Sequence, residues 1–302
     1  MTDIILITID SLRADHLGCY GYHRDTSPTI DRLASGGVLF SQAISSAGRT
    51  PDAFPSMLAS VLPAIGKPGT IPRSAKTLAQ QLKEDGYRTA AFHSNPYLTR
   101  YYGYDRGFDT FSDSIDEYSF WKGRLWMRAV TKPQRSHKSN KLVAFMFKLV
   151  ARILTPLSFH VVRRPIVTAE KITQQGLDWL AEQHGKGFLW LHYMDVHHPY
   201  LPLPQYLSQF RQEPIGRRRT ADLYRRMLKE PRKLSPDDIT ALVDLYDADI
   251  KYVDDNIKRL LDGLSNRLED TLVIVTADHG DEFGEHGIFS HQSLYEGIIR
   301  VP

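Results

Sequence analysis

Four short stretches of the chain are apolar at nearly every position, and longer stretches with helical signals separate them. A continuous apolar run of this length is typical of a strand that is buried on both faces, as in a parallel sheet covered by helices. We therefore predict four strands of one mostly parallel sheet, at Ile4–Ile9, Arg88–Phe92, Phe188–Tyr193 and Leu272–Ala277.

Helices are expected between these strands, because the start and stop signals of helices fall there. A polar capping residue before a helix and a glycine after it are the usual boundaries. The predicted helices begin at Ser27-Pro28, at Thr77, at Thr168 and at Ser235-Pro236, and the last three end near Gly86, Gly185 and Gly263. Strands that alternate with helices predict a doubly wound α/β fold, here one domain over residues 1–302.

Two segments interrupt this alternation, residues 114–166 and residues 201–234, and both are predicted to be insertions at the rim of the sheet. Residues 121–165 hold eleven Lys or Arg and no Asp or Glu; the whole chain carries +3, so the remaining residues carry −8. A segment of this charge suits contact with anionic lipid, nucleic acid or an acidic partner, and the alternative is a solvated basic face. Residues 141–154 could form an amphipathic helix, on a membrane or in the core. Nucleic-acid binding is disfavoured, because no recognition motif accompanies the charge.

The composition, 42% hydrophobic and 24% charged over 302 residues, excludes a disordered or collagen-like chain. The single cysteine, Cys19, excludes an intramolecular disulfide and a cysteine-based metal cluster. No apolar stretch approaches the roughly 20 residues of a membrane span, and the chain begins without a secretory signal. We expect a cytoplasmic location, with peripheral contact to an anionic membrane through residues 121–165 as an additional hypothesis.

Polar side chains stand at the carboxyl end of every predicted strand, where open α/β sheets bind their ligands. They are Asp10, the run His93-Ser94-Asn95, the group His192, Asp195, His197 and His198, and the pair Asp278-His279. Each residue alone is commonly a helix cap or a hydrogen-bonded surface residue. Four strands that end alike predict instead that carboxylates and imidazoles converge on a divalent metal site.

A nucleophile is expected in the segment from Gly48 to Ser60, where a loop leads into an apolar helix. At the start of that helix, free backbone N–H groups and the helix dipole would favour an oxyanion at Thr50, and a metal would lower the pKa of its hydroxyl. The alternative, and on this segment alone the commoner case, is that Thr50 only caps the helix. The residue at which this helix begins is not settled by the sequence, because Pro55 would fit only in the first turn of a helix.

Six motifs, in order, resemble the sulfatases within the alkaline phosphatase superfamily. They are Ile9–Gly18, Thr26–Ala34, Tyr104–Asp109, His192–Tyr200, Asp278–Gly287, and Tyr295-Glu296 with Arg300-Val301-Pro302. The resemblance runs from residue 2 to residue 302 and implies the α/β fold of that superfamily. It also implies further strands and a small C-terminal subdomain, so we expect that this chain is cut short.

The resemblance further implies which side chains form the site. Asp10, Asp278 and His279, with Thr50, would hold the metal, and His197 and His291 would contact the transferred group or protonate the leaving group. Arg13 and Asn95 are expected to bind the substrate. Ser11 replaces the second Asp of the family's common pair, so one carboxylate ligand is missing. Mixed oxygen and imidazole ligands favour Mn or Zn over Ca, with Mg also open.

The sequence departs from the family at the nucleophile. Sulfatases carry Cys or Ser there, with Pro at the second following position and Arg at the fourth, and the residue is oxidised to formylglycine. Here these positions hold Thr50, Asp52 and Phe54, and a threonine cannot become formylglycine. Relatives in the superfamily that use threonine are phosphodiesterases and phosphoethanolamine transferases, which form a phosphothreonine.

We therefore expect a sulfatase-like, metal-dependent hydrolase of sulfate or phosphate esters that forms a covalent intermediate on Thr50. Phosphate esters or diesters are favoured chemically, and the substrate is a small-molecule or lipid-linked anionic ester. One alternative is a transferase of the phosphoethanolamine type. The other is a non-catalytic homologue that binds an anion or a membrane surface.

Overall fold

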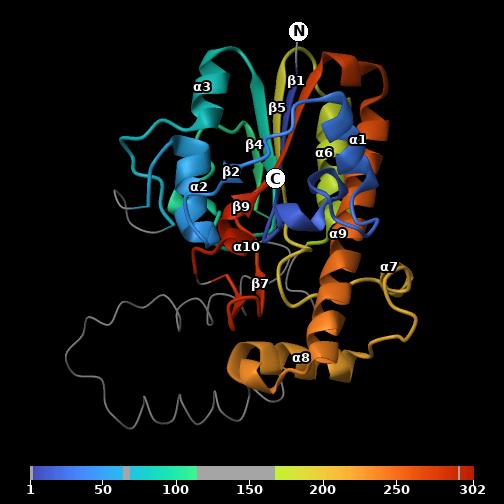
Figure 1. Ribbon diagram of the computed structural model, residues 1–302. Coiled ribbons are helices and arrows are strands. Elements are labelled where there is room, and N and C mark those ends of the chain that lie inside the picture. Colours follow the sequence, from blue (N-terminus) through green and yellow to red (C-terminus); the bar gives the residue numbers. More distant parts are fainter. Residues whose placement is uncertain (1–2, 64–68, 114–166, 292) are drawn as a thin grey trace, which may run out of the picture.

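The computed structural model describes residues 3–63, 69–113, 167–291 and 293–302 (Figure 1). The predicted basic insertion 114–166, the amphipathic helix 141–154 and the membrane contact through 121–165 lie outside these residues. Among the described residues, no helix is both long and apolar enough to cross a membrane.

A parallel five-stranded sheet forms the centre of the protein, in the order β4-β3-β5-β1-β6. The four predicted strands are confirmed as β1 (Asp3–Ile9), β3 (Arg88–Phe92), β5 (Gly187–Tyr193) and β6 (Thr271–Ala277). The short edge strand β4 (Thr110–Ser112) was not predicted. All seven residues of β5 are buried, as expected for a strand covered on both faces.

Helices cover both faces of the sheet, so the doubly wound α/β prediction is confirmed (Figure 1). Ile5, Ile7 and Ile9 of β1 face the side of α1 (Pro28–Gly36), α6 (Ala169–Ala181) and α9 (Pro236–Leu264). Leu6 faces the other side, with α2 (Thr50–Ala59) and α3 (Leu78–Glu84). Alternate residues of one strand therefore enter two separate cores.

The predicted helix starts are reproduced, but Ser27 at α1 and Thr168 at α6 make no side-chain cap. Thr77 accepts a hydrogen bond from Gln80 N and forms a capping box at α3. Ser27 precedes Pro28 of α1 but makes no side-chain cap. The carboxylate of Asp254, on α9, instead accepts the amides of Thr29 and Ile30, in bonds as short as 2.9 Å. The cap is thus supplied by a helix 225 residues away, which sequence order does not reveal.

The remaining elements are short and lie mainly near the ends of the sheet. Residues 201–234, predicted as a rim insertion, form α7 (Pro204–Leu207), α8 (Arg217–Lys229) and the 3-10 helix η4 (Pro231–Lys233). Figure 1 shows α8 beyond the end at which β1 and β5 finish. Two small antiparallel pairs join β2 (Ala43–Ile44) to β9 (Arg300–Val301) and β7 (Glu282–Phe283) to β8 (Phe289–Ser290), and α10 spans Glu296–Ile299.

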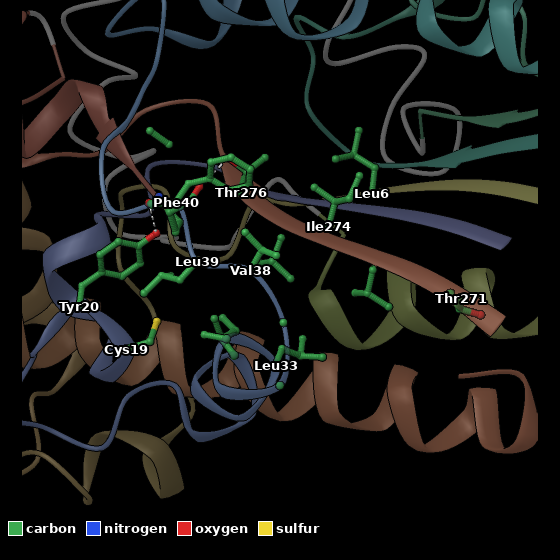
Figure 2. A pocket seen from close by; sticks show the side chains of 18 of the residues that line it. Leu6, Cys19, Tyr20, Leu33, Val38, Leu39, Phe40, Thr271, Ile274 and Thr276 are labelled. Carbon is green, nitrogen blue, oxygen red and sulfur yellow. Dashed lines mark hydrogen bonds between the residues drawn. The ribbon is translucent and has the colours of Figure 1, made fainter. Parts of the chain in front are cut away.

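An open apolar groove runs along β6, the other edge strand of the sheet (Figure 2). Val38 and Phe40 border it and are 83% and 70% exposed, and Ile274 of β6 is 40% exposed. Tyr20 donates its hydroxyl to Phe40 O at 3.0 Å and holds this segment beside the groove. The groove contains none of the predicted metal ligands, so this hollow of the described surface is not where the chemistry is expected.

Candidate metal centre and active site

The predicted metal ligands meet at the carboxyl ends of two neighbouring strands. In the β1–β6 pair, Ile9 lies opposite Ala277, so Asp10 and Asp278 leave the sheet side by side. Asp10, Asp278 and His279 are fully buried, and one ligand atom from each lies within 4.8 Å of those from the other two. The next residue must be small, because a Cβ on Gly280 would lie 2.1 Å from Gly297 O. The structure therefore brings the predicted ligands together.

The donor set fits a divalent cation. The Oδ2 atom of Asp278 is buried and accepts no hydrogen bond, and burial together with the charge of Asp10 raises the pKa of Asp278. His279 donates Nδ1–H to Gly280 O at 2.9 Å, which leaves the lone pair of Nε2 free to bind. Two desolvated carboxylates beside an available imidazole form a donor set that suits a divalent cation.

Ser11, which the resemblance aligns with the second aspartate of the common pair, has an unusual backbone. Its φ of +61° lies in the left-handed region, which costs a residue with a Cβ free energy and is tolerated where the surroundings hold it. In this conformation Ser11 N donates to Asp278 Oδ1 at 3.3 Å, and its hydroxyl donates to Asp10 Oδ1 at 2.9 Å. Ser11 therefore orients both carboxylates, although it brings no charge of its own.

Thr50 lies at the start of α2 with its hydroxyl beside the metal ligands. Its Oγ1 is 3.3 Å from Asp10 Oδ2 and 3.3 Å from His279 Nε2. The residue before the helix is Arg49, whose guanidinium pairs with Asp52. Thr50 is thus the first helical residue and does not cap the helix, so the alternative interpretation of this threonine is wrong.

Pro55 sits inside α2 rather than in its first turn, contrary to the expectation for proline. A proline at this position leaves Pro51 O without its usual donor four residues on. The amide of Gly69 takes that role, at 2.6 Å from Pro51 O. The helix therefore continues past Pro55 and keeps Thr50 at its N-terminus, where the dipole favours negative charge.

A chain of hydrogen bonds behind Asp10 fixes its orientation. The indole N–H of Trp190 donates to Thr8 Oγ1 at 2.9 Å, and Thr8 Oγ1 lies 2.9 Å from His192 Nδ1 but 3.4 Å from Leu191 O. Because Thr8 Oγ1 lies nearer to His192 Nδ1 than to Leu191 O, we assign its proton to the bond with Nδ1. The proton of His192 is then on Nε2, which lies 3.5 Å from Asp10 Oδ2. Although burial alone would raise it, the pKa of Asp10 is lowered by His197, His192 and His279.

Asn95 reaches the site but faces the protein. Its Nδ2 donates to Asp10 Oδ2 at 3.0 Å and to Met194 Sδ at 3.1 Å, while its Oδ1 accepts the amide of Tyr97. The prediction that Asn95 donates to a substrate oxygen is not met by this geometry, because the amide is already engaged. Asn95 positions a metal ligand instead.

Arg13 does not join the site, which corrects the prediction that it binds substrate. Its guanidinium forms a two-bond pair with Asp15 and also donates to Glu285 and to Asp281 O, and it is 6% exposed. These partners fix Arg13 under the loop that follows β6. Asp15 is two residues from Arg13 in the sequence, whereas Asp281 and Glu285 are about 270 residues away. The spacing of residues in the sequence therefore did not indicate this set of contacts.

His197 and His291, both predicted, belong to a second cluster of imidazoles built around Asp281. His291 Nδ1 lies 2.9 Å from Asp281 Oδ1, and His198 Nδ1 lies 3.4 Å from Asp281 Oδ2. The hydroxyl of Tyr200 donates to the same carboxylate at 2.6 Å. The ring centroids of His291 and His279 are 4.4 Å apart, so the second cluster borders the metal ligands.

The two predicted histidines have opposite electrostatic surroundings. Burial lowers the pKa of His197 to about 4, and His198 and His291 add to this effect. Burial also opposes the charge of His291, but the hydrogen bond and charge of Asp281 raise the pKa of His291 overall. At neutral pH, His291 is therefore the better proton donor and His197 a neutral ligand or acceptor.

Sequence reasoning named His198 among the polar residues at the strand ends but gave no role to three other members of this cluster. Asp281 and Tyr200 stood in recognised motifs, and Tyr224 of α8 lies 5.6 Å from the ring of His198. The repeated His-His before Pro199 was the only sequence signal that pointed to a cluster of imidazoles. Of the other polar residues at strand ends, Asp195 accepts the amide of Ala169 at 2.8 Å at the start of α6. His93 packs between the rings of Phe111 and Trp190.

The family model described as Sulfatase matches residues 2–302. Iduronate 2-sulfatase of Mus musculus is 24% identical over 341 residues, which cover 99% of this chain and 58% of that protein. The chain thus spans a little under three fifths of the length of this curated relative.

Solved structures share the fold at lower identity. The phosphonate monoester hydrolase of Agrobacterium radiobacter superimposes with a TM-score of 0.70 at 18% identity, over all of this chain and 67% of that chain. The soluble domain of lipooligosaccharide phosphoethanolamine transferase A from Neisseria meningitidis gives 0.66 at 18% identity, over all of this chain and 75% of that chain. These likenesses confirm the predicted α/β architecture.

Proposed function

The chain belongs to the sulfatase family, and on that premise we propose that it is a metal-dependent hydrolase of phosphate esters or diesters with Thr50 as nucleophile. One observation carries the proposal: the Thr50 hydroxyl lies 3.3 Å from both Asp10 Oδ2 and His279 Nε2, at the N-terminus of α2. A hydroxyl in this place is oriented by the groups that would hold a cation and faces the positive end of a helix.

Phosphate is favoured over sulfate by the residues around the nucleophile. The Cβ of threonine carries a methyl group, so its oxidation cannot give the aldehyde of formylglycine. Asp52 stands where sulfatases of the formylglycine type have proline, and it is tied to Arg49 at 2.7 Å. Phe54 stands in place of their arginine and is fully buried against the rings of Trp190 and His192.

In the proposed reaction, Thr50 Oγ loses its proton to solvent and attacks the phosphorus in line. The new Oγ–P bond forms while the bond from phosphorus to the leaving oxygen breaks, and the departing alcohol takes a proton from His291. Water then attacks the phosphothreonine and passes one proton to His291, while the Thr50 oxygen takes a proton from solvent as it leaves. A monoester substrate thus yields phosphate, and a diester yields a phosphate monoester. Each step conserves charge and atoms, and one water is consumed per ester cleaved.

Asp10, Asp278 and His279 would hold a divalent cation, which supplies positive charge near the nucleophile and the transferred group. The protein's own contribution is orientation. Ser11 and Asn95 direct the carboxylates, and the Trp190-Thr8-His192 chain supports Asp10 from behind.

A transferase is the second candidate, because the likeness includes a phosphoethanolamine transferase. It would use the same first half-reaction and pass the group from Thr50 to an acceptor alcohol instead of water. The same geometry supports both outcomes, and a lipid-linked donor would suit the transferase.

The test is to trap the intermediate and compare substrates. Cation-loaded protein is incubated with aryl sulfate, phosphate monoester, phosphodiester and phosphonate, and a mass increase on the peptide that contains Thr50 is sought after acid quench. We expect a phosphate adduct on Thr50, and the loss of both adduct and turnover in Thr50→Ala. Acceptor alcohols that divert the product would favour the transferase.

Thr77→Ala is the matched control, because Thr77 also begins a helix but does cap it. We expect it to lose about 1 kcal/mol of stability and to keep its activity. Turnover of aryl sulfate alone, or full activity in Thr50→Ala, would overturn the proposal.

A further inference from the structure

We propose that helix α8 docks the protein on an anionic lipid surface, through an outward stripe that consists of Arg217, Arg218, Arg225 and Leu228. Residues 211–233, which include α8, hold nine Lys or Arg and three Asp or Glu. The helix lies beyond the end of the sheet at which β1 and β5 finish (Figure 1). A basic helix that also exposes an apolar side chain has the composition of helices that bind anionic membrane surfaces.

The other sides of α8 are occupied by contacts within the protein. Three residues at helical spacing are buried, namely Thr220, Leu223 and Met227. Beside this buried face, Arg219 and Arg226 both donate to the carboxylate of Asp238 on α9, Arg226 at 2.6 Å. Asp238 is 3% exposed, and a buried carboxylate requires such partners. These two arginines therefore attach the helix to α9.

The outward stripe has charges that the protein itself does not balance. Arg217 and Arg218 are exposed, and neither forms an ion pair within the part of the chain that the structure describes. Arg225 pairs with Asp222 at 2.9 Å and is exposed as well. Two unpaired guanidinium groups on one exposed stripe favour an external partner with negative charge.

The stability of the helix does not explain the arginines of its first turn. Cations are unfavourable there, because the positive end of the helix dipole lies at the N-terminus. The first turn contains no acidic residue, and Gly216 precedes the helix without a side-chain cap. Asp238 balances Arg219, whereas Arg217 and Arg218 have no such partner. An anionic surface outside the protein would supply the missing negative charge.

Leu228 favours a lipid surface over a soluble polyanion. It is 44% exposed and lies one turn after Arg225, on the same side of the helix. In a helix at a membrane surface, such a side chain enters the acyl boundary while the arginines remain among the headgroups. The phosphate backbone of a nucleic acid would contact the arginines and would leave Leu228 in water.

Tyr224 connects the outward stripe to the histidine cluster. Its ring lies 5.6 Å from the ring of His198. Arg217 lies two turns before Tyr224 and Leu228 one turn after it, so both project from the side of α8 that borders this cluster. A phosphate ester in a lipid headgroup would then approach the protein on that side. This consequence rests on the proposed function, whereas docking itself does not.

The test is cosedimentation of the full chain with lipid vesicles, without substrate. Phosphatidylcholine vesicles are compared with vesicles in which about a third of the lipid is phosphatidylglycerol, and we expect binding to the anionic vesicles only. Each arginine at the surface contributes about fivefold, so the double variant Arg217→Gln, Arg218→Gln should bind about 25-fold more weakly. The matched control is Arg32→Gln with Arg73→Gln, two exposed arginines outside α8. It should change binding by less than about threefold, because salt screens distant charges.

Leu228→Ser tests the apolar contribution. We expect binding to weaken about tenfold, and this loss should persist at raised salt, where the contribution of the arginines declines. The replaced side chains are exposed, so thermal unfolding of each variant should match that of the native protein.

Three outcomes would overturn the proposal. The first is no binding, or equal binding to both kinds of vesicle. The second is a double variant of Arg217 and Arg218 that binds like its control. The third is unchanged binding in Leu228→Ser, which would assign the arginines to a soluble polyanion. None of these outcomes depends on the proposed function, whose failure would appear as the absence of an adduct on Thr50.

Discussion

Replacing Asp281 by asparagine isolates the electrostatic role of the carboxylate beneath the histidine cluster. The change keeps the shape of the side chain and removes a charge that lies 2.9 Å from His291 Nδ1. A hydrogen bond to a charged group contributes about 1.5–3 kcal/mol, and one pKa unit corresponds to about 1.4 kcal/mol. We therefore expect the pKa of His291 to fall in Asp281→Asn.

The sign of the effect on catalysis follows from the protonated form that the reaction needs. In the native protein, Asp281 raises the pKa of His291 above its usual 6.5, so activity declines only as pH rises past that raised value. In Asp281→Asn the decline begins at lower pH. At pH 7.5, kcat/KM should drop about 10- to 100-fold, whereas near pH 5 the two proteins should differ much less.

The assay is the pH profile of kcat/KM on a phosphate ester, with Mg²⁺ or Mn²⁺ as the only added cation. Glu282→Gln is the matched control, because Glu282 is also a buried carboxylate paired with a histidine, His286, at 3.0 Å. Its profile should not shift. A ratio of native to Asp281→Asn activity that stays constant from pH 5 to pH 8 would refute the reasoning.

The same pair predicts a pH window for stability. The raised pKa of His291 stabilises the folded state below pH 6.5, and this stabilisation is lost as the pH rises through the raised pKa. The lowered pKa of Asp281 stabilises the folded state above pH 3.8, and this stabilisation is lost as the pH falls through the lowered pKa. The stability difference between native protein and Asp281→Asn should therefore be largest between about pH 4 and 6.5. Thermal unfolding across this range measures it.

Three further changes test other parts of the site. Thr8→Val breaks the hydrogen-bond chain behind Asp10, and we expect cation affinity to fall about 10- to 100-fold. Calorimetric titration measures the affinity, and Thr8→Ser is the control that keeps the hydroxyl. Burial and Asp10 raise the pKa of Asp278, so its ionised form costs stability above pH 3.8 when no cation is bound. Asp278→Asn should then stabilise chelator-treated protein by about 1–3 kcal/mol and remove the gain in melting temperature on adding cation; a loss of stability instead would contradict this. Phe54→Ala empties a fully buried site between α2 and the sheet and should cost about 3–5 kcal/mol in urea unfolding.

The strands could be predicted because burial on both faces leaves a direct trace in the sequence. Ile4–Ile9 and Phe188–Tyr193 are continuous apolar runs, and both are central strands. The edge strand Thr110–Ser112 is three residues long, too short for any periodicity. Helix α8 was overlooked because its arginines suggested a polar rim, although the buried positions Thr220, Leu223 and Met227 have helical spacing.

The site residues that the strand topology brings together could be predicted from the sequence. The residues whose role depends on the direction of the side chain could not. Asp10 and Asp278 follow adjacent parallel strands, so the fold alone brings them together. Which way an amide or a guanidinium points depends on partners that are distant in sequence. Asn95 turns toward Asp10, and Arg13 toward Asp15 and Glu285, and neither contact is visible from spacing.

The position of β1 inside the sheet sets a time order for making the protein. Its two neighbours are β5 and β6, and Ile4 pairs with Phe188. At 5–20 residues per second, a ribosome needs about 10–40 s between them. Throughout that interval the first strand is an apolar ribbon without a partner on the nascent chain, a target for chaperones that bind extended segments. Asp10 gains its neighbour Asp278 later still, because Asp278 follows β6, which is the last strand in chain order of the described sheet.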